Sequence, residues 1–410
     1  MCMSYWIKNV RLDTGYLYED EQVVETCTAL FHIRIEDGLI QEIVPVSSII
    51  VDEHLTTYDA NGLLLLPSFH DAHIHLDKTF YGGNWRAVRP AGSLFERIEQ
   101  ERKLLPELIP VARQRTGHLL DLLLSHGSTH VRGHVNIDPV SGLRMLESTL
   151  AALEDYKGRV TTRLVAFPQH GLLHSDSVTL VRAAMQNGAQ YVGAVDPATV
   201  DRDMERSLQT IMEIAVETGA GIDVHIHDQG TAGLETLVRL ADLTEEAGWQ
   251  GKVTVSHAFA FATNALEEVT TLAKRFAALD IAVTSTVPIG RMNMPIPLMT
   301  SLGVNVMLGT DSVTDHWSPF GNGDNLEKVG RLAELYGHSS EFALSQSIKY
   351  ITNGITPLDE HGNRVWPSVG DEASLVLVEA SCTAEAVARR AVRKAVIHKG
   401  AMVFGTIGEK

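Results

Sequence analysis

Near both ends of the chain, apolar positions recur in short runs that polar turn residues interrupt, a pattern typical of β-strands. Strands are expected at residues 5–11, 30–36 and 39–44, and again at 373–378 and 395–404 around a helix at 383–393. Because the two ends share this texture, they are expected to share a sheet. The sequence therefore predicts a small β-sandwich domain built from both termini, residues 1–66 and 368–410.

Between these ends the pattern changes to short apolar, β-branched runs, each followed by ten or more residues with helical periodicity. Residues 233–243, for example, carry apolar side chains at helical spacing. This alternation favours a buried parallel sheet, and residues 67–367 are predicted to form a (β/α)8 TIM barrel. The expected strands are residues 63–66, 129–135, 163–167, 191–195, 222–226, 253–256, 282–285 and 305–308.

Composition narrows the possible partners. The chain has 34 Lys and Arg residues against 51 Asp and Glu residues, a formal charge of -17, which disfavours binding to nucleic acid or to an anionic membrane surface. No apolar run approaches the roughly 18 residues of a membrane span, and no leader pattern stands at the N-terminus. The cysteines Cys2, Cys27 and Cys382 form no disulfide framework, so a cytoplasmic location is expected.

Histidine and aspartate residues follow several of the predicted barrel strands. In a barrel, the carboxyl ends of the strands carry the chemistry. Four of these ends hold residue types that bind metals: His73 and His75; His225 and His227; His257; and Asp311. Alternate residues of an extended segment face the same side, so His73 and His75 can both reach one ion. Together the four ends indicate a site of nitrogen and oxygen ligands suited to Zn, Fe or Mn.

Seven segments of the chain carry recognisable motifs: PSFHDAHIHLDKTF (67–80), GSTHVRGHVNIDP (127–139), AFPQHG (166–171), VGAVDPAT (192–199), IDVHIHDQGT (222–231), VTVSHAF (253–259) and GTDSVTDHWSPFGNGD (309–324). With these motifs the chain resembles the amidohydrolase superfamily in its cytosine-deaminase-like branch. Within that branch, the motifs HIHDQGT and PFGNGD most resemble those of the N-isopropylammelide isopropylaminohydrolases, which are s-triazine C–N hydrolases.

The resemblance implies one divalent ion held by His73, His75, His225 and Asp311, with His257 close to the metal-bound water. Related binuclear enzymes carry a carbamylated lysine after the fourth strand, and no such lysine is evident here, which favours a single ion. Zinc is expected first, and iron or manganese suits the same ligands.

Two departures from the cytosine deaminase pattern speak against cytosine itself as substrate. Asp228 replaces a proton-shuttling Glu, and Ser312 replaces an Asp that follows the ligating carboxylate. Gln169, by contrast, fits that pattern, in which the amide pairs with a ring carbonyl and N–H. The same Gln after a strand could instead cap the next helix.

A metal-bound hydroxide would attack an electron-poor ring carbon that bears an amine. Asp311 would accept the proton of the water, and His257 would stabilise the developing oxyanion. The expelled amine needs a proton, and His227 is the expected donor because imidazole titrates near neutrality. Asp228 would orient His257, contact the substrate or cap the following helix.

Residues after the eighth strand are expected to shape the substrate site. Trp317 would stack on a planar heteroaromatic ring or close the barrel mouth, and Asp315 would order this loop or contact an exocyclic group. Lys78 is expected at the lid or rim of the site, with Trp85, Arg86 and Arg89.

The sequence thus predicts a metal-dependent aminohydrolase acting on a small aminopyrimidine or aminotriazine-like ring. One alternative is a cyclic-amide hydrolase of the dihydropyrimidinase or dihydroorotase type, which would use two metals. Another is a barrel without catalysis that serves as a scaffold, but the ligand positions are all filled. Whether ammonia or an alkylamine leaves stays open, as does assembly into a homo-oligomer.

Overall fold

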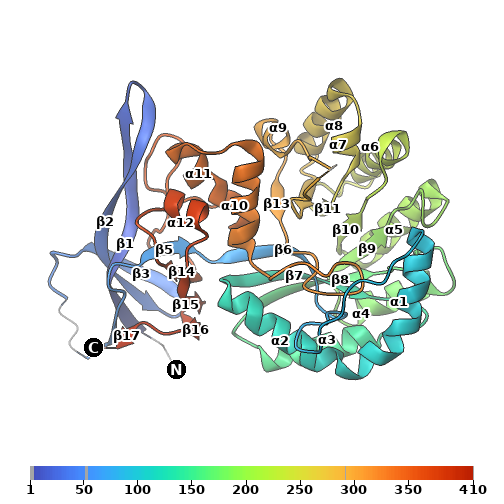
Figure 1. Cartoon of the computed structure of the whole chain (residues 1–410), viewed down its shortest axis with the longest axis horizontal. Helices are drawn as coiled ribbons and strands as arrows, with labels where there is room; N and C mark the ends of the chain where they lie inside the picture. The colour runs from blue at the N-terminus through green and yellow to red at the C-terminus, as the bar shows by residue number, and fades with distance from the viewer. Residues whose placement is uncertain (1–3, 51–53, 291, 410) are drawn as a thin grey trace.

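The computed structural model describes residues 4–50, 54–290 and 292–409, which form two β-sheets (Figure 1). In one, eight parallel strands form a nearly closed barrel with helices between them. The other is a separate sheet that joins strands from both ends of the chain. The predicted fold class is therefore confirmed. The predicted boundaries, residues 1–66 with 368–410 and residues 67–367, stay a prediction.

The barrel strands follow one another in chain order, and each pairs in parallel with the next. Seven of them match predicted strands to within two residues at either end. The eight barrel strands are β6 (Phe69–His75), which had no predicted counterpart, β7 (Ser128–Asn136), β8 (Thr161–Phe167), β9 (Tyr191–Val195), β10 (Gly221–His225), β11 (Val253–Ser256), β12 (Ala282–Ser285) and β13 (Val306–Leu308).

The first barrel strand was predicted wrongly. Residues 63–66 fall almost wholly in β5 (Leu64–Pro67), which pairs antiparallel with β14 (Leu375–Val378) in the other sheet. Leu64 and Leu66 pack into the barrel core, whereas Leu65 packs into the core of the terminal sheet. Because β5 is buried on both faces, its apolar run looks like that of a parallel barrel strand.

The terminal sheet confirms that the two chain ends pair with each other. Its main strand order is β16-β15-β14-β5-β1-β2-β3, with β4 paired to β1 and β17 paired to β4. The region expected as one strand at 395–404 is a hairpin that turns at Lys399 and Gly400. The remaining strands are β1 (Ser4–Glu19), β2 (Gln22–Glu36), β3 (Leu39–Pro45), β4 (Thr56–Asp59), β15 (Arg393–His398), β16 (Ala401–Gly405) and β17 (Gly408–Glu409).

Helices lie outside the barrel and beside the terminal sheet (Figure 1). None of those in the described part of the chain has the length and apolar character that crossing a membrane requires. They are α1 (Leu94–Leu108), η1 (Ile109–Val111), α2 (Ala112–Ser125), α3 (Arg144–Asp155), α4 (Ser177–Gln186), α5 (Met204–Thr218), α6 (Gly230–Glu246), α7 (Ala260–Thr263), α8 (Leu266–Ala278), α9 (Ile296–Ser301), α10 (Asn325–Tyr336), α11 (Glu341–Ser347), η2 (Ile348–Ile351) and α12 (Thr383–Arg389).

The barrel closes where the residues after β13 meet β6. The amide of His75 donates to the carbonyl oxygen of Asp311 at 2.8 Å, and the amide of Asp311 donates to the carbonyl oxygen of His73 at 2.7 Å. Asp71 supports this seam because its buried carboxylate accepts hydrogen bonds from the amide and the hydroxyl of Thr310. The seam therefore consists of the backbone of residues that the sequence places in the metal site.

The close approach at the seam needs a glycine. A Cβ at Gly309 would lie 2.6 Å from both the Cβ and the carbonyl oxygen of His73 and 2.7 Å from its amide nitrogen. These are backbone and near-backbone atoms, which cannot rotate away.

We expect Gly309→Ala to lower the free energy of unfolding by about 3 kcal/mol, because the added methyl group overpacks the seam. Urea unfolding would measure the change. The control is Gly15→Ala in β1, where a Cβ would meet only a carbonyl oxygen at 3.6 Å. Equal stability of the two variants would contradict a tightly packed seam.

Candidate metal centre and substrate cavity

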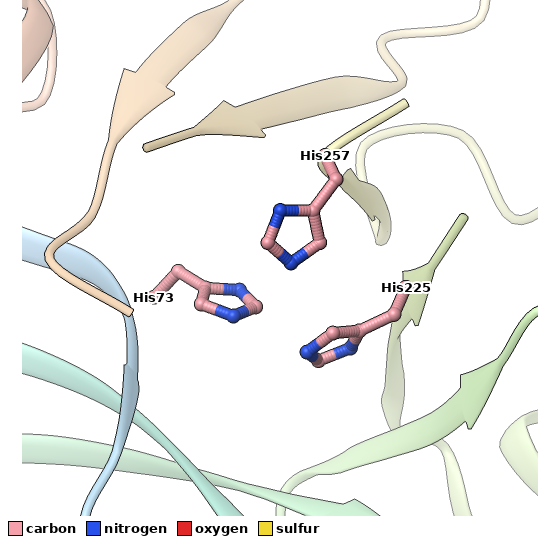
Figure 2. A group of neighbouring side chains, drawn as sticks. All are labelled: His73, His225 and His257. Carbon is pink, nitrogen blue, oxygen red and sulfur yellow. The ribbon is translucent and has the colours of Figure 1, made fainter. Parts of the chain in front are cut away.

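Four histidines and a carboxylate gather at the carboxyl ends of the barrel strands. Figure 2 shows the rings of His73, His225 and His257 pointing toward a common centre; His73 and His225 lie on β6 and β10, and His257 directly follows β11. The Nε2 atoms of His73 and His75 lie 3.4 and 3.5 Å from Asp311 Oδ1, and the Nε2 atoms of His75 and His225 lie 3.4 Å apart. Ligand atoms of His73, His225 and His257 also lie within 4.8 Å of one another.

The environment of these rings suits metal ligands. His73 Nε2 and His257 Nε2 are buried and have no hydrogen-bond partner in the described structure. Burial lowers the pKa of His75, His225 and His257 well below the ordinary histidine value, so each ring is neutral and offers a lone pair. A cation held by His73, His75, His225 and Asp311 would give three of these imidazoles a partner, and three imidazoles with one carboxylate fit Zn, Fe or Mn.

Hydrogen bonds behind His73 orient its ring. The Ser256 hydroxyl donates to Asp223 Oδ1 at 2.7 Å, so it must accept the hydrogen bond from His73 Nδ1, also at 2.7 Å. This arrangement places the proton on Nδ1 and leaves the Nε2 lone pair facing the centre. Asp223 is held in turn by Arg132 Nη1 at 3.0 Å. This chain of partners was not predicted, although Asp223 lies two residues before His225 on the same strand face.

Asp311 and His257 occupy backbone conformations that few residues other than glycine adopt. Their φ angles are 64° and 70°, in the left-handed region that costs energy for residues with a side chain. His257 directly follows β11, and Asp311 lies shortly after β13, where the chain turns away from the barrel. Burial raises the pKa of the Asp311 carboxyl, but its contact with His73 and the nearby imidazoles of His257 and His75 lower it well below its ordinary value.

His227 has a carboxylate partner that the sequence did not single out. Asp196, directly after β9, accepts a hydrogen bond from His227 Nδ1 at 2.9 Å. Burial lowers the pKa of His227, but the charge and hydrogen bond of Asp196 raise it above the ordinary histidine value. The ring stacks on His257 with centroids 4.3 Å apart. Asp196 lies within the motif word VGAVDPAT, and its position at a strand end was the available signal.

Asp228 lies beside His227 and Asp196, but its carboxylate faces Thr199. Its carboxylate accepts hydrogen bonds from the amide and the hydroxyl of Thr199, and its amide donates to Asp196 Oδ1 at 3.1 Å. The residue that precedes α6 is Gln229, so the expectation that Asp228 caps this helix is wrong. A contact between Asp228 and substrate stays a prediction.

A cavity of about 270 Å³ opens beside the histidine cluster. It brings together the predicted residues Gln169, Asp315 and Trp317 with the candidate ligands, and Asp228 is not among its lining residues. The lining residues are His75, Lys78, Leu94, Gln169, Val195, Asp196, His225, His227, His257, Asp311, Ser312, Asp315, Trp317 and Ser318.

Lys78 is a wall of this cavity rather than part of its rim, which corrects the sequence-based expectation. Its side chain is 2% exposed, and Nζ lies 3.2 Å from Glu101 Oε1. Nζ also donates to Gln169 Oε1 at 2.6 Å, so the Gln169 amide group has its NH2 end left to donate. Burial lowers the pKa of Lys78, but Glu101 and other carboxylates raise it above the ordinary lysine value. Trp85, by contrast, is 71% exposed, as expected for the rim.

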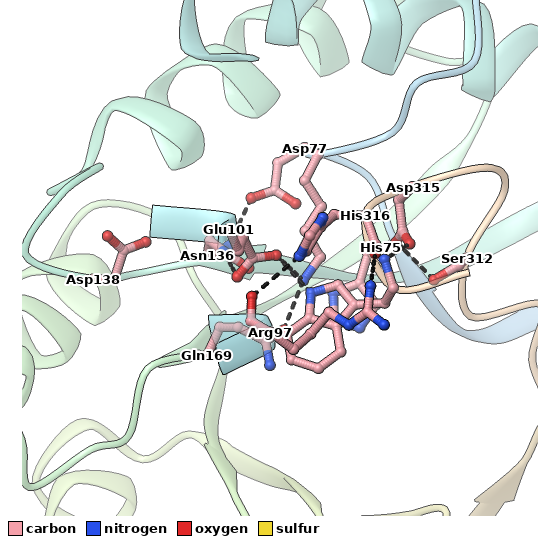
Figure 3. Close-up of polar contacts among 12 residues, drawn as sticks. His75, Asp77, Arg97, Glu101, Asn136, Asp138, Gln169, Ser312, Asp315 and His316 are labelled. Atoms are coloured by element: carbon pink, nitrogen blue, oxygen red, sulfur yellow. Dashed lines mark hydrogen bonds and ion pairs between the residues drawn. The ribbon is translucent and has the colours of Figure 1, made fainter. Parts of the chain in front are cut away.

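Glu101 ties helix α1 to this wall (Figure 3). Its carboxylate is fully buried and accepts from Trp317 Nε1 at 2.7 Å as well as from Lys78. The other oxygen lies 3.4 Å from Asn136 Nδ2 and 3.3 Å from His170 Nε2. Glu101 was not predicted as a site residue, because a Glu normally lies at the protein surface and nothing next to it in the sequence marks it as buried.

Asp315 orders the loop after β13. Its carboxylate accepts hydrogen bonds from the amides of Trp317 and Ser318 and from the hydroxyl of Ser312, at 2.7, 2.9 and 2.7 Å. With both oxygens engaged, Asp315 positions the Trp317 ring against the cavity, which is one of the two roles expected of it.

Comparisons with known proteins agree with this geometry. A model of the amidohydrolase family matches residues 56–404. YahJ of Escherichia coli (strain K12), an uncharacterized protein, is 47% identical over 406 residues, 98% of this chain and 88% of YahJ. The crystal structure of N-isopropylammelide isopropylaminohydrolase from Burkholderia multivorans ATCC 17616 has a TM-score of 0.86 at 31% identity over 98% of both chains. That of 5-methylcytosine deaminase from Klebsiella pneumoniae has a TM-score of 0.80 at 26% identity, covering 99% of this chain and 98% of the deaminase.

We expect Glu101→Gln to lower the free energy of unfolding at neutral pH by about 3 kcal/mol, because it leaves the buried Lys78 ammonium without its carboxylate. Urea unfolding would measure this. Glu99→Gln on the exposed side of α1 is the matched control.

The stability difference between Glu101→Gln and the wild type should also depend on pH. Burial raises the pKa of Glu101, but the Lys78 charge lowers it below the ordinary 4.5. A lowered folded-state pKa stabilises the protein fully above the unfolded-state value, and this contribution is lost as pH falls through the folded-state pKa. The difference should therefore narrow as the pH falls below 4.5, and a constant difference would contradict the ion pair.

Proposed function

This chain belongs to the amidohydrolase family, and we propose that it is a metal-dependent aminohydrolase that hydrolyses an exocyclic C–N bond of a nitrogen heterocycle. The observation that carries the proposal is the convergence of histidine Nε2 atoms and one Asp311 oxygen at the floor of a ring-sized cavity. Two relatives support it by their names, one an isopropylaminohydrolase and the other a deaminase.

We assign His73, His75, His225 and Asp311 as ligands of one divalent ion, zinc first, with iron or manganese as alternatives. When bound, such an ion lowers the pKa of a coordinated water to about 7 and so supplies a nucleophile at neutral pH. The remaining chemistry falls to the side chains around it. Asp311 presents a carboxylate to accept the proton of the attacking water, on the cavity side where the ring carbon would lie.

His257 and His227 complete the proposed reaction. His257 Nε2 is buried without a protein partner and can donate a hydrogen bond to the oxyanion that develops when the water oxygen attacks the ring carbon. The Nδ1–H group of His227 is hydrogen-bonded to Asp196, so the proton on its Nε2 is the one available to the departing amine. The stacking of the two rings places donor and stabiliser side by side.

The cavity wall indicates which edge of a ring would bind. Lys78 Nζ holds the Gln169 oxygen, so Lys78 and the Gln169 NH2 group together present donors to the cavity. Donors pair with ring carbonyl oxygens or their anionic forms rather than with ring N–H groups. Trp317 offers a face for stacking. We therefore favour an oxo-substituted aminotriazine or aminopyrimidine, acted on in the cytoplasm.

The cyclic-amide alternative has less support. It relies on a lysine after the fourth barrel strand to bridge two ions, and that strand, β9, is followed by Asp196 and Pro197. A scaffold without catalysis would be expected to lose ligands, whereas each ligand position here carries a suitable side chain facing the centre.

A panel of aminotriazines, aminopyrimidines and pterins, scored by release of ammonia or alkylamine with metal content measured in parallel, tests the proposal. Activity should be lost on chelation and restored by zinc.

His257→Ala should lower kcat by about 10³-fold while the bound ion is retained, because oxyanion stabilisation is lost. His361→Ala, an exposed histidine in the loop of residues 359–364, is the control. Full turnover by His257→Ala would refute the assigned role.

A second measurement tests whether the hydrogen-bond donors of Lys78 and Gln169 face the substrate ring. Gln169→Ala should raise KM roughly tenfold for rings with an oxo group, because one hydrogen bond to that group is lost. Rings without an oxo group should be affected far less. Gln209→Ala on the outer helix α5 serves as the control, and an equal rise in KM for both ring classes would contradict this orientation.

A further inference from the structure

A second group of metal-ligand residues lies near the amino-terminal ends of the barrel strands, away from the cavity. We call it the junction cluster and define it as His130, Glu372 and His398. His130 lies near the start of barrel strand β7, and His398 is the last residue of β15 in the terminal sheet. One ligand atom from each residue lies within 4.8 Å of the others, and His130 Nε2 is 3.7 Å from Glu372 Oε1.

Hydroxyl groups orient both imidazoles of the junction cluster. Thr129 donates its hydroxyl proton to Ser68, so it accepts from His130 Nδ1 at 3.1 Å and leaves the Nε2 lone pair toward Glu372. Ser374 donates its hydroxyl proton to Glu372, so it accepts a hydrogen bond from His398 Nδ1 at 3.2 Å. The lone pair of His398 is therefore on Nε2, which lies 3.0 Å from Thr161 Oγ1. Such partners are typical of metal-binding histidines.

The carboxylate and the access route also suit an ion. Ser374 donates to Glu372 Oε1 at 2.6 Å, and Lys399 lies on the other oxygen, Oε2, at 3.8 Å. The side chains of His130 and Glu372 are 21% and 43% exposed, which gives an ion a path and leaves room for a water ligand. His398 itself is buried.

We propose that the junction cluster binds one divalent ion of the zinc type through His130, His398 and Glu372, with water as a fourth ligand. Two imidazoles, a carboxylate and water form a common zinc coordination set. Zinc–ligand bonds of about 2.0–2.2 Å would require the exposed Glu372 side chain to move inward. The bound ion would link the barrel to the terminal sheet, because its ligands come from both.

This site is independent of the proposed function. It bears on one test of that function, however, because two ions per chain would not by themselves indicate a binuclear catalytic centre.

Equilibrium dialysis of metal-free full-length protein against micromolar Zn²⁺, followed by metal analysis, tests the proposal. We expect two ions per chain in the wild type and one in the His130→Gln, Glu372→Gln double variant. One ion is also expected in a His73→Ala, His225→Ala variant, which keeps the junction cluster. His361→Gln, a change at an exposed histidine outside both groups, should keep two.

Thermal unfolding provides a second readout that needs no activity. Zn²⁺ should raise the Tm of the His73→Ala, His225→Ala variant by several degrees, because an ion that binds only the folded state stabilises it. The same addition should leave that variant unchanged once His130→Gln and Glu372→Gln are combined with it.

Two outcomes overturn the proposal. One is a wild-type content of one ion that the junction substitutions leave in place. The other is a second ion that persists in the junction variant. A single ion that is lost only with the junction substitutions would support this site and refute the metal ligands of the proposed function. If the His73→Ala, His225→Ala variant does not fold, the metal contents of the wild type and of the His130→Gln, Glu372→Gln variant alone decide whether the junction cluster binds an ion.

Discussion

The closure of the barrel at Asp311 is the constraint on which the rest of the structure depends. Its amide and carbonyl groups exchange hydrogen bonds with the backbone of His73 and His75, so the same residue closes the ring and faces two candidate ligands. A one-residue shift at this seam would turn alternate side chains to the other face of β6 and separate the imidazoles. Gly309 makes the approach possible. The precision of the site therefore derives from backbone packing rather than from flexible loops.

A second constraint is the buried ion pair of Lys78 and Glu101. Neither charge could be buried alone without a large cost, and Trp317, Asn136 and Gln169 complete the hydrogen bonds of the pair. Helix α1 is thereby attached to the cavity wall through one carboxylate. The polarity of the wall follows directly: the Gln169 oxygen is engaged by Lys78, and the groups left to face a ring are donors.

Much of the fold and of the candidate metal centre was predictable from local patterns. Apolar runs separated by helical periodicity indicated the barrel, because each strand must bury both faces. The spacing of His73 and His75 and the positions of His225, His257 and Asp311 after strands indicated convergence, because parallel strands end at one edge. The same local pattern misled at β5, which is buried between two cores and is not part of the barrel.

Other features of the site could not be inferred from local sequence. Asp196 beside His227, Ser256 and Asp223 behind His73, and Glu101 beneath Lys78 are all partners from distant segments. The sequence by itself determined the order of strands and helices and the kinds of side chain at the strand ends, since these depend on periodicities of a few residues. Only the tertiary structure decided which charges are buried together, because pairing in three dimensions depends on packing between segments that share no sequence pattern.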